Sequence, residues 1–494
     1  MALNKKFTRA KLLIIIITTV FSFSSMSDAF FLKSYSAIPW FILCAIVYFF
    51  PYCIILSDLT SVYQDEKGGV YSWLKETNTE KVAFIATFLW YGSYFTWIIS
   101  LVMKTWIPLS ILIFGKDLTG SNQSVWHLSA IQWVGILSIL LIIVMTLATF
   151  GGFRNISFFS VMSGRFMLFL VSVMFVGSLF LFIGHHGQFA EPLHVNNLFK
   201  SQGQFQTPIE NLSFLLFGIT AFGGLDTVSS LVNNTGELKR NFGKYLLVSG
   251  IVILSMYILG VIFWGAGINV QEFIHGPYHL GNLMYGLMGQ LSLNITNLLG
   301  LSASAGAVLT TIFMRLTALT LFTAYISLLS ILFFVPIRSL LESIRGMRGD
   351  NVTEERQKIQ LKKALGLQAV FIALFVFVLS FQNQWAAALY NKLTIMTNIS
   401  RSIPYLLVAL SYPKFKQLYP THPYLSFVNN KKVTYLLSGL VALAVFLGIV
   451  FSVYQKISVK QFVDASWLVS GPLLFSVVGY VFYKMIVKNP NKLA

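Results

Sequence analysis

The strongest constraint in this sequence is a series of apolar stretches, each about as long as a membrane is thick. A helix needs about 20 apolar residues to cross the hydrocarbon core. Twelve stretches qualify, near 12–32, 37–56, 83–113, 130–150, 156–184, 211–232, 245–268, 305–337, 364–381, 386–412, 433–454 and 466–487. Only 11% of the 494 residues are charged, whereas soluble proteins carry about 25%. The sequence therefore predicts an all-α integral membrane protein with twelve transmembrane helices, and it excludes a water-soluble enzyme.

The distribution of positive charge predicts the orientation of these helices. With the N-terminus inside, 25 of the 35 Lys and Arg residues fall in inner loops and tails, and 5 fall in outer loops. Basic residues are retained on the cytoplasmic side, so we expect both termini in the cytoplasm of a bacterial cell (plasma or inner) membrane. The stretch 280–301 is nearly long enough to span, but the basic run 338–363 would then face outward. We expect 280–301 to form one or two external amphipathic helices over the entrance.

Two of the apolar stretches contain residues that interrupt a helix. In the first stretch the run is Ser22, Ser24, Ser25 and Ser27, followed by Asp28; in the sixth it is Gly218, Thr220, Gly223 and Gly224, followed by Asp226. A broken helix is tolerated in a membrane where the freed backbone groups face a cavity, another helix or a ligand. The alternative is that these small residues only permit close helix packing. Because the two runs lie five spans apart, we favour a binding site.

Seven ionisable residues lie at membrane depth, where each needs a partner or a watery cavity. They are Asp28, Asp226, Lys104, Arg165, Arg315, Lys392 and Arg401. The surplus of three positive charges predicts an anionic or acidic substrate, although Lys104 and Lys392 could instead extend toward the membrane surface. Lys392 and Arg401 are nine residues apart, about 180° around a helix, so both should not line one pathway. We retain Lys104, Arg315 and Lys392 as gating candidates in preference to Arg401.

Four short motifs resemble the amino acid–polyamine–organocation (APC) superfamily of transporters. Residues 65–73 (DEKGGVYSW) are similar to its "P-E-x-G-G-x-Y-x-W" loop after helix two, and residues 221–226 (AFGGLD) to its broken-helix motif, with Asp in place of the usual Glu. Residues 237–242 and 333–338 resemble the segments after spans six and eight, the latter in the glutamate/GABA antiporter branch. With the twelve spans, the resemblance covers essentially the whole chain.

The resemblance implies one transmembrane domain over 1–494 with a five-plus-five inverted repeat. The repeats would be 12–184 and 211–412, with unwound helices 1 and 6, and the two helices within 433–487 would lie outside the repeat. The substrate carboxylate would bind at Ser22–Ser27 and the amino group at Ala221–Gly224, with Phe222 as an aromatic lid. Asp226 would hold the sixth helix or relay closure. Arg165 would stand where sodium binds in sodium-coupled relatives.

The function expected from these features is secondary active transport by an amino-acid exchanger of the glutamate/GABA type, working by alternating access. The alternatives are a proton-coupled permease for a neutral amino acid or polyamine, and an amino-acid sensor that does not translocate. A membrane enzyme would need clustered acids or histidines, whereas Asp28 and Asp226 are single and far apart in sequence. The expected partners are an amino-acid substrate and the lipid bilayer, with a homodimer left open. We expect no enzymatic activity, nucleic acid, cofactor or metal.

Overall fold

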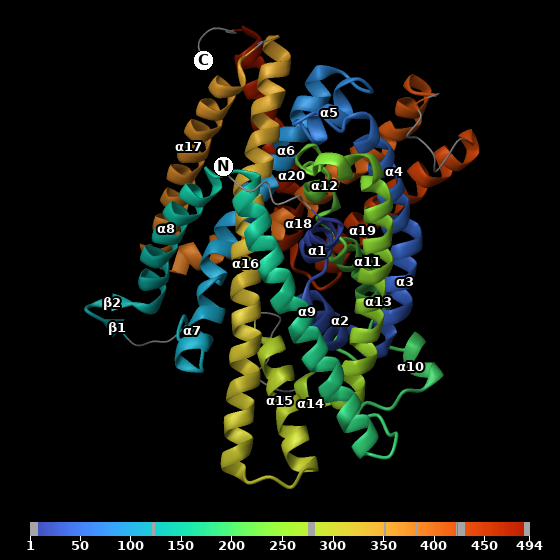
Figure 1. Cartoon of the computed structure of the whole chain (residues 1–494), viewed down its shortest axis with the longest axis vertical. Helices are drawn as coiled ribbons and strands as arrows, with labels where there is room; N and C mark the ends of the chain where they lie inside the picture. The colour runs from blue at the N-terminus through green and yellow to red at the C-terminus, as the bar shows by residue number, and fades with distance from the viewer. Residues whose placement is uncertain are drawn as a thin grey trace.

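The computed structural model describes residues 8–120, 124–274, 282–349, 352–381, 384–420, 422 and 430–488, with most side chains of 382–395 left undescribed. Within these residues the chain is almost entirely helical (Figure 1). Up to residue 184 the elements are α1 (Arg9–Val20), α2 (Phe23–Lys33), η1 (Ser34–Ser36), α3 (Ala37–Cys44), η2 (Ala45–Phe49), α4 (Phe50–Val62), α5 (Val70–Lys75), α6 (Glu80–Lys104), α7 (Trp106–Phe114), β1 (Ser124–Val125), β2 (Leu128–Ser129), α8 (Ala130–Thr149) and α9 (Phe153–Gly184).

The second part of the chain continues the helical pattern. Its elements are α10 (Val195–Phe199), α11 (Pro208–Ala221), α12 (Leu225–Ser229), η3 (Val232–Asn234), η4 (Gly236–Asn241), α13 (Phe242–Gly267), α14 (Gln271–Ile274), α15 (Leu283–Leu298), α16 (Ala303–Arg348), α17 (Glu354–Phe381), α18 (Gln384–Leu418), α19 (Lys431–Ser458) and α20 (Phe462–Lys488). The only sheet in the described residues is the antiparallel pair β1–β2.

Ten stretches of the described chain are long and apolar enough to cross a membrane, compared with the twelve expected. One of them, Arg9–Val62, contains both of the first two predicted stretches. The predicted stretch 386–412 lies in α18, which is not among the ten. The predicted stretch 83–113 is divided at Thr105 into α6 and α7. The chain is therefore a multi-pass helical membrane protein.

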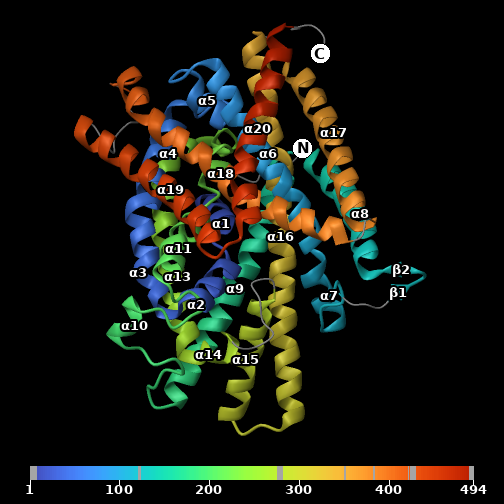
Figure 2. The same cartoon turned by 180° about the vertical axis from the view of Figure 1, so that it is seen from behind.

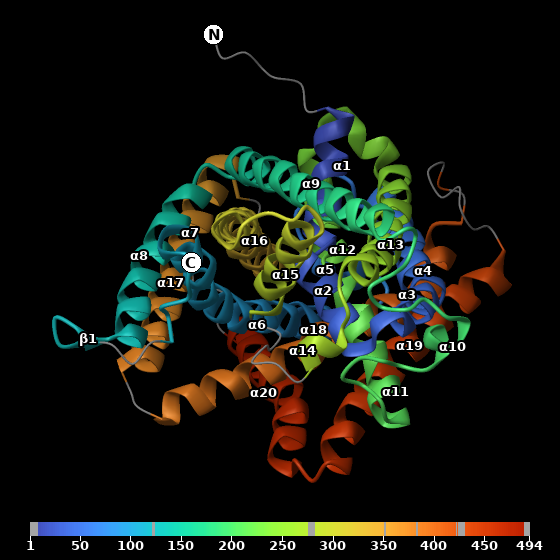
Figure 3. The same cartoon turned by 90° about the horizontal axis from the view of Figure 1, so that it is seen from below.

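The helices form an elongated bundle with distinct ends. In Figures 1 and 2, α5 lies at one end, and α10, α14 and α15 lie at the other. Viewed from that second end (Figure 3), α2 and α12 lie toward the middle, and α8 and α17 run side by side at one edge. Helix α15 packs along α16 and α9. It is thus a single helix standing against α16 instead of a helix lying flat, and residues 280 and 281 of the predicted segment are outside the described chain.

The first apolar stretch is interrupted between α1 and α2. Helix α1 ends at Val20, and Phe21 and Ser22 are both extended, with ψ of 133° and 122°. The side chain of Ser22 accepts a hydrogen bond from the Ser25 N–H at 3.2 Å. Serine is a preferred residue at this position because its oxygen replaces a missing helical acceptor. The first serine of the run therefore caps the start of α2, while α1 ends two residues before it.

The sixth stretch is interrupted between α11 and α12. Helix α11 ends at Ala221, and Gly224 before α12 has a φ of +105°. Only glycine adopts this conformation readily. A Cβ atom at Gly224 would also lie 2.7 Å from the carbonyl oxygen of Thr19 in α1. This glycine therefore lets the two interrupted stretches approach each other closely.

Candidate functional site

A cavity of about 460 Å³ lies where the two helix interruptions meet. This volume falls within the range of about 300–1,000 Å³ that is typical of small-molecule sites. Its walls come from both interrupted stretches and from α6, α9, α15, α16 and α18. The lining polar residues include Thr18, Thr19, Ser22, Ser24, Ser25, Asp28, Tyr94, Ser100, Lys104, Thr220, Thr227, Tyr285, Tyr325, Thr397 and Arg401. The cavity can therefore surround a small polar molecule on several sides.

Three of the four predicted serines contribute to this cavity. Ser22, Ser24 and Ser25 line it. Ser27 does not: it is fully buried, and its hydroxyl donates to the carbonyl oxygen of Phe23 at 3.0 Å. Because α2 begins at Phe23, Ser27 is turned away from the cavity in this structure, and its part in substrate binding stays a prediction.

The second interruption contributes three of its four expected residues to the cavity. Ala221, Gly223 and Gly224 line the cavity. Phe222 does not line it: its side chain is fully buried and stacks on Phe49, with ring centroids 4.3 Å apart. Phe222 therefore does not face the cavity in this structure, and its role as an aromatic lid stays a prediction. Its side chain packs toward η2 and is part of the core.

Tyr257 of α13 joins the two interruptions. Its hydroxyl donates to the carbonyl oxygen of Ala221 at 2.9 Å and accepts from the N–H of Ser22 at 3.2 Å. Its ring stacks on Phe41, with centroids 4.7 Å apart. Buried backbone groups need hydrogen-bond partners, and this tyrosine satisfies one group at each helix end. The sequence carries no signal for this role, because Tyr257 lies in an otherwise ordinary apolar stretch.

Asp226 lies beside the cavity rather than in its wall. It is buried in α12, and its Oδ2 atom accepts from Trp90 Nε1 at 2.5 Å and from the Tyr94 hydroxyl at 3.0 Å. The same hydroxyl lies 2.9 Å from Thr227 Oγ1. Bonds to a carboxylate are stronger than bonds between neutral groups. Through these hydrogen bonds Asp226 links α12, in the sixth stretch, to α6.

Three charged side chains line the cavity. Asp28 lies in its wall, and its Oδ1 atom is buried without a hydrogen-bond partner in the described part of the chain. Lys104 and Arg401 also line it, and the Arg401 guanidinium lies 4.6 Å from the ring centroid of Trp97. If these groups are ionised, the wall carries one negative and two positive charges. Asp28 was recognised in the sequence as an intramembrane acid but was not assigned to the site.

The choice between Lys392 and Arg401 is reversed by the structure. Lys392 is not in the cavity wall and lies 5.3 Å from the ring centroid of Trp467. The spacing of nine residues predicts that the two side chains do not share one face, and only Arg401 lines this cavity. Sequence alone does not give the rotation of α18 about its axis, so it could not show which of the two does.

Arg165 and Arg315 lie outside the cavity. Arg165 is exposed on the face of α9 that also carries exposed Phe158 and Phe169. Arg315 is exposed, and its Nη2 atom donates to the carbonyl oxygen of Ile113 at 3.4 Å. Arg165 does not line the cavity in this structure, and its role in place of a coupling sodium ion stays a prediction.

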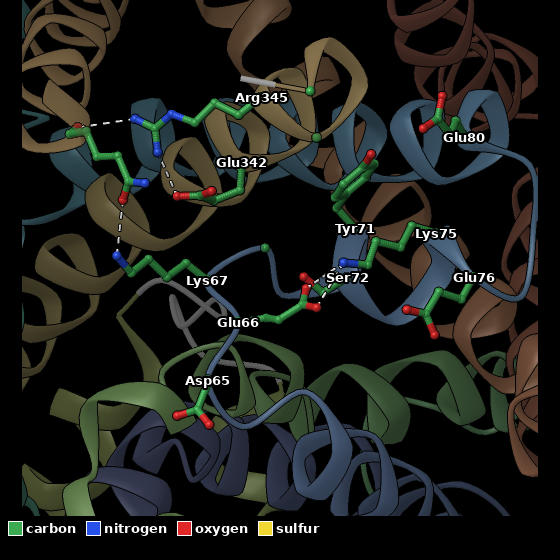
Figure 4. Close-up of a pocket in the computed structure, with 14 residues that line it drawn as sticks. Asp65, Glu66, Lys67, Tyr71, Ser72, Lys75, Glu76, Glu80, Glu342 and Arg345 are labelled. Carbon is green, nitrogen blue, oxygen red and sulfur yellow. Dashed lines mark hydrogen bonds and ion pairs between the residues drawn. The ribbon is translucent and has the colours of Figure 1, made fainter. Parts of the chain in front are cut away.

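A second cavity, of about 630 Å³, lies at the α5 end of the bundle (Figure 4). Many of its charged side chains pair with each other. Lys75 bonds to Glu66 at 2.9 Å, and Arg345 Nη1 bonds to Glu342 at 2.7 Å. Tyr71 also lines it, and burial raises its pKa to about 12. This cavity lies away from the helix interruptions and holds residues of the DEKGGVYSW motif.

Comparison with known proteins identifies the family. A profile described as amino acid permease matches residues 7–478. The chain belongs to the amino acid permease family. It is therefore a membrane transporter, and the APC resemblance is confirmed. It is similar to proteins named inner membrane transporter YjeM. The one from Salmonella typhimurium is 32% identical over 97% of this chain and 96% of its own length. The one from Escherichia coli is 30% identical over 99% and 98%.

A more distant relative carries a substrate in its name. The protein named aspartate/glutamate permease AcaP, from Lactococcus lactis, is 25% identical over 48% of this chain and 48% of its own length. The two YjeM relatives match this chain over nearly their whole length and so show the family. Their names place them in a bacterial inner membrane.

Proposed function

We propose that the chain is a secondary active amino-acid transporter that exchanges substrates of the glutamate/GABA type by alternating access. In this proposal the chain has twelve spans: ten form two inverted repeats of five, over 12–184 and 211–412, and two within 433–487 lie outside the repeats. Both termini are in the cytoplasm. The single observation that carries the proposal is the polar cavity between the two interrupted stretches, bridged by Tyr257. Transporters of this architecture bind substrate at such discontinuous helices.

The charges of the cavity support an acidic substrate. With Asp28 ionised, Lys104 and Arg401 leave the wall with a net charge of one positive. A dicarboxylic amino acid carries a net charge of one negative at neutral pH and would offset it. The start of α2 suits the α-carboxylate, because helix N-termini favour anions. The carboxylate of Asp28 in the cavity wall suits the ammonium group. The printed name of the relative AcaP points to the same substrate class.

Exchange requires that the loaded cavity opens to each side in turn. The interrupted stretches are the moving parts in this proposal, since their ends depend on a few side-chain bonds and not on a continuous helical ladder. Asp226 couples α12 to Trp90 and Tyr94 of α6. Tyr257 couples both interruptions to α13. Movement at one interruption would therefore be transmitted to the other.

A second candidate is a proton-coupled permease for a neutral amino acid. It is favoured by one observation, the buried Asp28 oxygen without a partner in the described chain. A carboxylate in such surroundings can take up and release a proton. A sensor that binds without translocating is the remaining alternative.

Counterflow in proteoliposomes tests these candidates. Purified full-length protein is reconstituted into vesicles preloaded with unlabelled glutamate, and the entry of labelled glutamate is followed. For an exchanger, preloading accelerates entry, and an imposed proton gradient is not required. A panel of the proteinogenic amino acids with GABA and ornithine then gives the substrate range. Uptake that needs a proton gradient and no internal substrate would select the permease, and binding without counterflow would select the sensor.

The matched variants are Lys104→Gln, in the cavity wall, and Lys392→Gln, outside it. Both remove one intramembrane lysine charge. We expect the first to weaken apparent glutamate affinity and the second to leave it near wild type. Equal behaviour of the two variants would count against substrate binding in this cavity.

A further inference from the structure

A third cavity, of about 480 Å³, shares part of its lining with the cavity drawn in Figure 4. It is bounded by the turn between α8 and α9, the end of α16 and the start of α17. Lys67, Glu342, Arg345 and Gln357 are shared between this cavity and the one in Figure 4. The transport cycle proposed above does not use this site, and the inference is independent of the substrate.

The charge of this cavity differs from that of its neighbour. Its lining cations are Lys67, Arg338, Arg345, Lys358 and Lys362, and its lining carboxylates are Glu342 and Glu354. The lining therefore carries a formal net charge of three positive. The cavity in Figure 4, by contrast, contains five carboxylates (Asp65, Glu66, Glu76, Glu80 and Glu342) and three cations (Lys67, Lys75 and Arg345).

Three of the five cations are held by other parts of the protein. Arg338 donates to Asn233 Oδ1 at 2.9 Å and to the carbonyl oxygen of Lys67 at 3.3 Å. Arg345 pairs with Glu342, and the Lys67 ammonium donates to Gln357 Oε1 at 3.1 Å. These bonds keep the three basic side chains in the cavity wall and occupy hydrogen-bond donors on each of them.

Lys358 and Lys362 are available for a ligand. Neither ammonium has a hydrogen bond or ion pair within the described ranges, and both side chains are exposed. They are four residues apart on α17 and so share one face of the helix. Lys362 lies 5.8 Å from the ring centroid of Phe150. Two adjacent unpaired ammonium groups above a fixed basic wall suit a phosphate group.

The remaining lining places this phosphate at the edge of the membrane. The apolar residues in the lining of this cavity are Phe150, Phe153, Phe334, Leu341, Leu361 and Leu365. Helix α8 ends at the cavity, while α17 continues past it as a charged segment (Figures 1 and 2). Beyond the cavity α17 exposes Leu367, Val370 and Phe371. The lining thus changes from charged to apolar along the direction in which a phospholipid passes from headgroup to acyl chain.

We propose that this cavity binds the phosphate headgroup of an anionic phospholipid from the inner leaflet, with Lys358 and Lys362 as the principal contacts. Basic pockets between transmembrane helices on the cytoplasmic side bind such headgroups. The bound lipid would join the α8–α9 turn to α16 and α17. It would thereby stabilise the packing of these helices.

The test is the thermal stability of detergent-purified full-length protein titrated with phosphatidylglycerol, with phosphatidylcholine or with inorganic phosphate. We expect phosphatidylglycerol to raise the Tm of wild type, and phosphatidylcholine and inorganic phosphate to raise it far less. Lys358→Gln/Lys362→Gln should bind phosphatidylglycerol about 30-fold more weakly, since each lysine near an anionic lipid contributes about 1 kcal/mol and about 1.4 kcal/mol is tenfold.

Two further variants make the test specific. Lys431→Gln/Lys432→Gln removes two exposed lysines at the start of α19, outside the cavity, and should keep the wild-type response. Lys358→Arg/Lys362→Arg keeps both charges and should also keep it. An undiminished phosphatidylglycerol response in Lys358→Gln/Lys362→Gln would overturn the proposal. An equal response of wild type to inorganic phosphate would also overturn it, by indicating a soluble anion as the ligand.

Discussion

The hydroxyl of Tyr257 donates to the carbonyl oxygen of Ala221, the last residue of α11, at 2.9 Å. The hydroxyl oxygen of Tyr257 also accepts a hydrogen bond from the N–H of Ser22, in the first interruption. A single side chain on α13 thus connects two helix ends that are about 200 residues apart in the chain. Because both bonds meet at one atom, a change at either interruption alters the geometry at the other.

Replacing Tyr257 by Phe removes both bonds and keeps the ring that stacks on Phe41. We expect a loss of stability of about 1–2 kcal/mol, because the buried carbonyl oxygen of Ala221 and the partly buried N–H of Ser22 both lose their partner. We also expect slower exchange. Tyr245→Phe on the same helix is the control, since its hydroxyl has no hydrogen bond among the described residues. Thermal denaturation and counterflow rates that are equal for both variants would contradict the bridging role.

Replacing Gly224 by Ala tests the close approach of the two interruptions. The residue has a φ of +105°, and the added Cβ would meet Thr19 O at 2.7 Å. A left-handed residue other than glycine costs about 1–2 kcal/mol, and relief of the contact requires α1 or α12 to shift. We expect a lower Tm and impaired transport. Gly439→Ala, in α19 with open space around it, should instead be neutral or slightly stabilising. Similar Tm values for the two variants would show that the approach tolerates a methyl group.

Replacing Asp226 by Asn keeps the shape of the side chain and removes its charge. The bonds from Trp90 and Tyr94 then lose their ionic character, and a bond to a charged group contributes about 1.5–3 kcal/mol compared with about 1 for a neutral one. We expect expression near wild type, little change in KM and a roughly tenfold lower kcat. Initial exchange rates normalised to reconstituted protein measure this. A variant with unchanged kcat would exclude Asp226 from the conformational step.

Much of the fold could be predicted from the lengths of the apolar stretches. The predicted stretches 130–150 and 156–184 differ by three residues at most from α8 and α9. The division of 83–113 at Thr105 could not be foreseen, because Thr105 is an ordinary residue within an apolar run. The break in the first stretch falls at the first residue of the serine run, and that in the sixth at the glycine pair. Local chemistry determines both positions.

The side chains around these breaks were less predictable, because they depend on helix rotation and on partners distant in the sequence. Ser27 and Phe222 lie within the expected segments but point into the protein core. Tyr257 and Arg401 reach the site from α13 and α18. Sequence spacing could show that Lys392 and Arg401 face opposite ways, but only the packing of α18 against α6 shows which one faces the cavity.

Replacing Arg401 by Gln tests whether this residue selects for a negative side chain. The change lowers the positive charge of the cavity wall and removes a charged hydrogen-bond donor for the side-chain carboxylate of the substrate. We expect the KM for glutamate to rise roughly 10- to 100-fold, with a much smaller change for neutral amino acids. Competition by a panel of unlabelled amino acids against labelled glutamate measures the shift. A uniform rise in KM for acidic and neutral substrates would indicate a structural role through Trp97 instead.

Replacing Arg165 by Ala tests whether this intramembrane charge has any part in coupling. Its exposed position on the same face of α9 as Phe158 and Phe169 places it outside the cavity. An exposed Arg at membrane depth extends toward the headgroups, and its removal should leave the binding site unchanged. We expect kcat and KM within about twofold of wild type, no sodium requirement, and at most a small change in stability. Exchange assays in sodium-containing and sodium-free buffer measure this. Loss of exchange, or a new sodium requirement, would instead place Arg165 in the coupling mechanism and require a conformation in which α9 turns toward the helix interruptions.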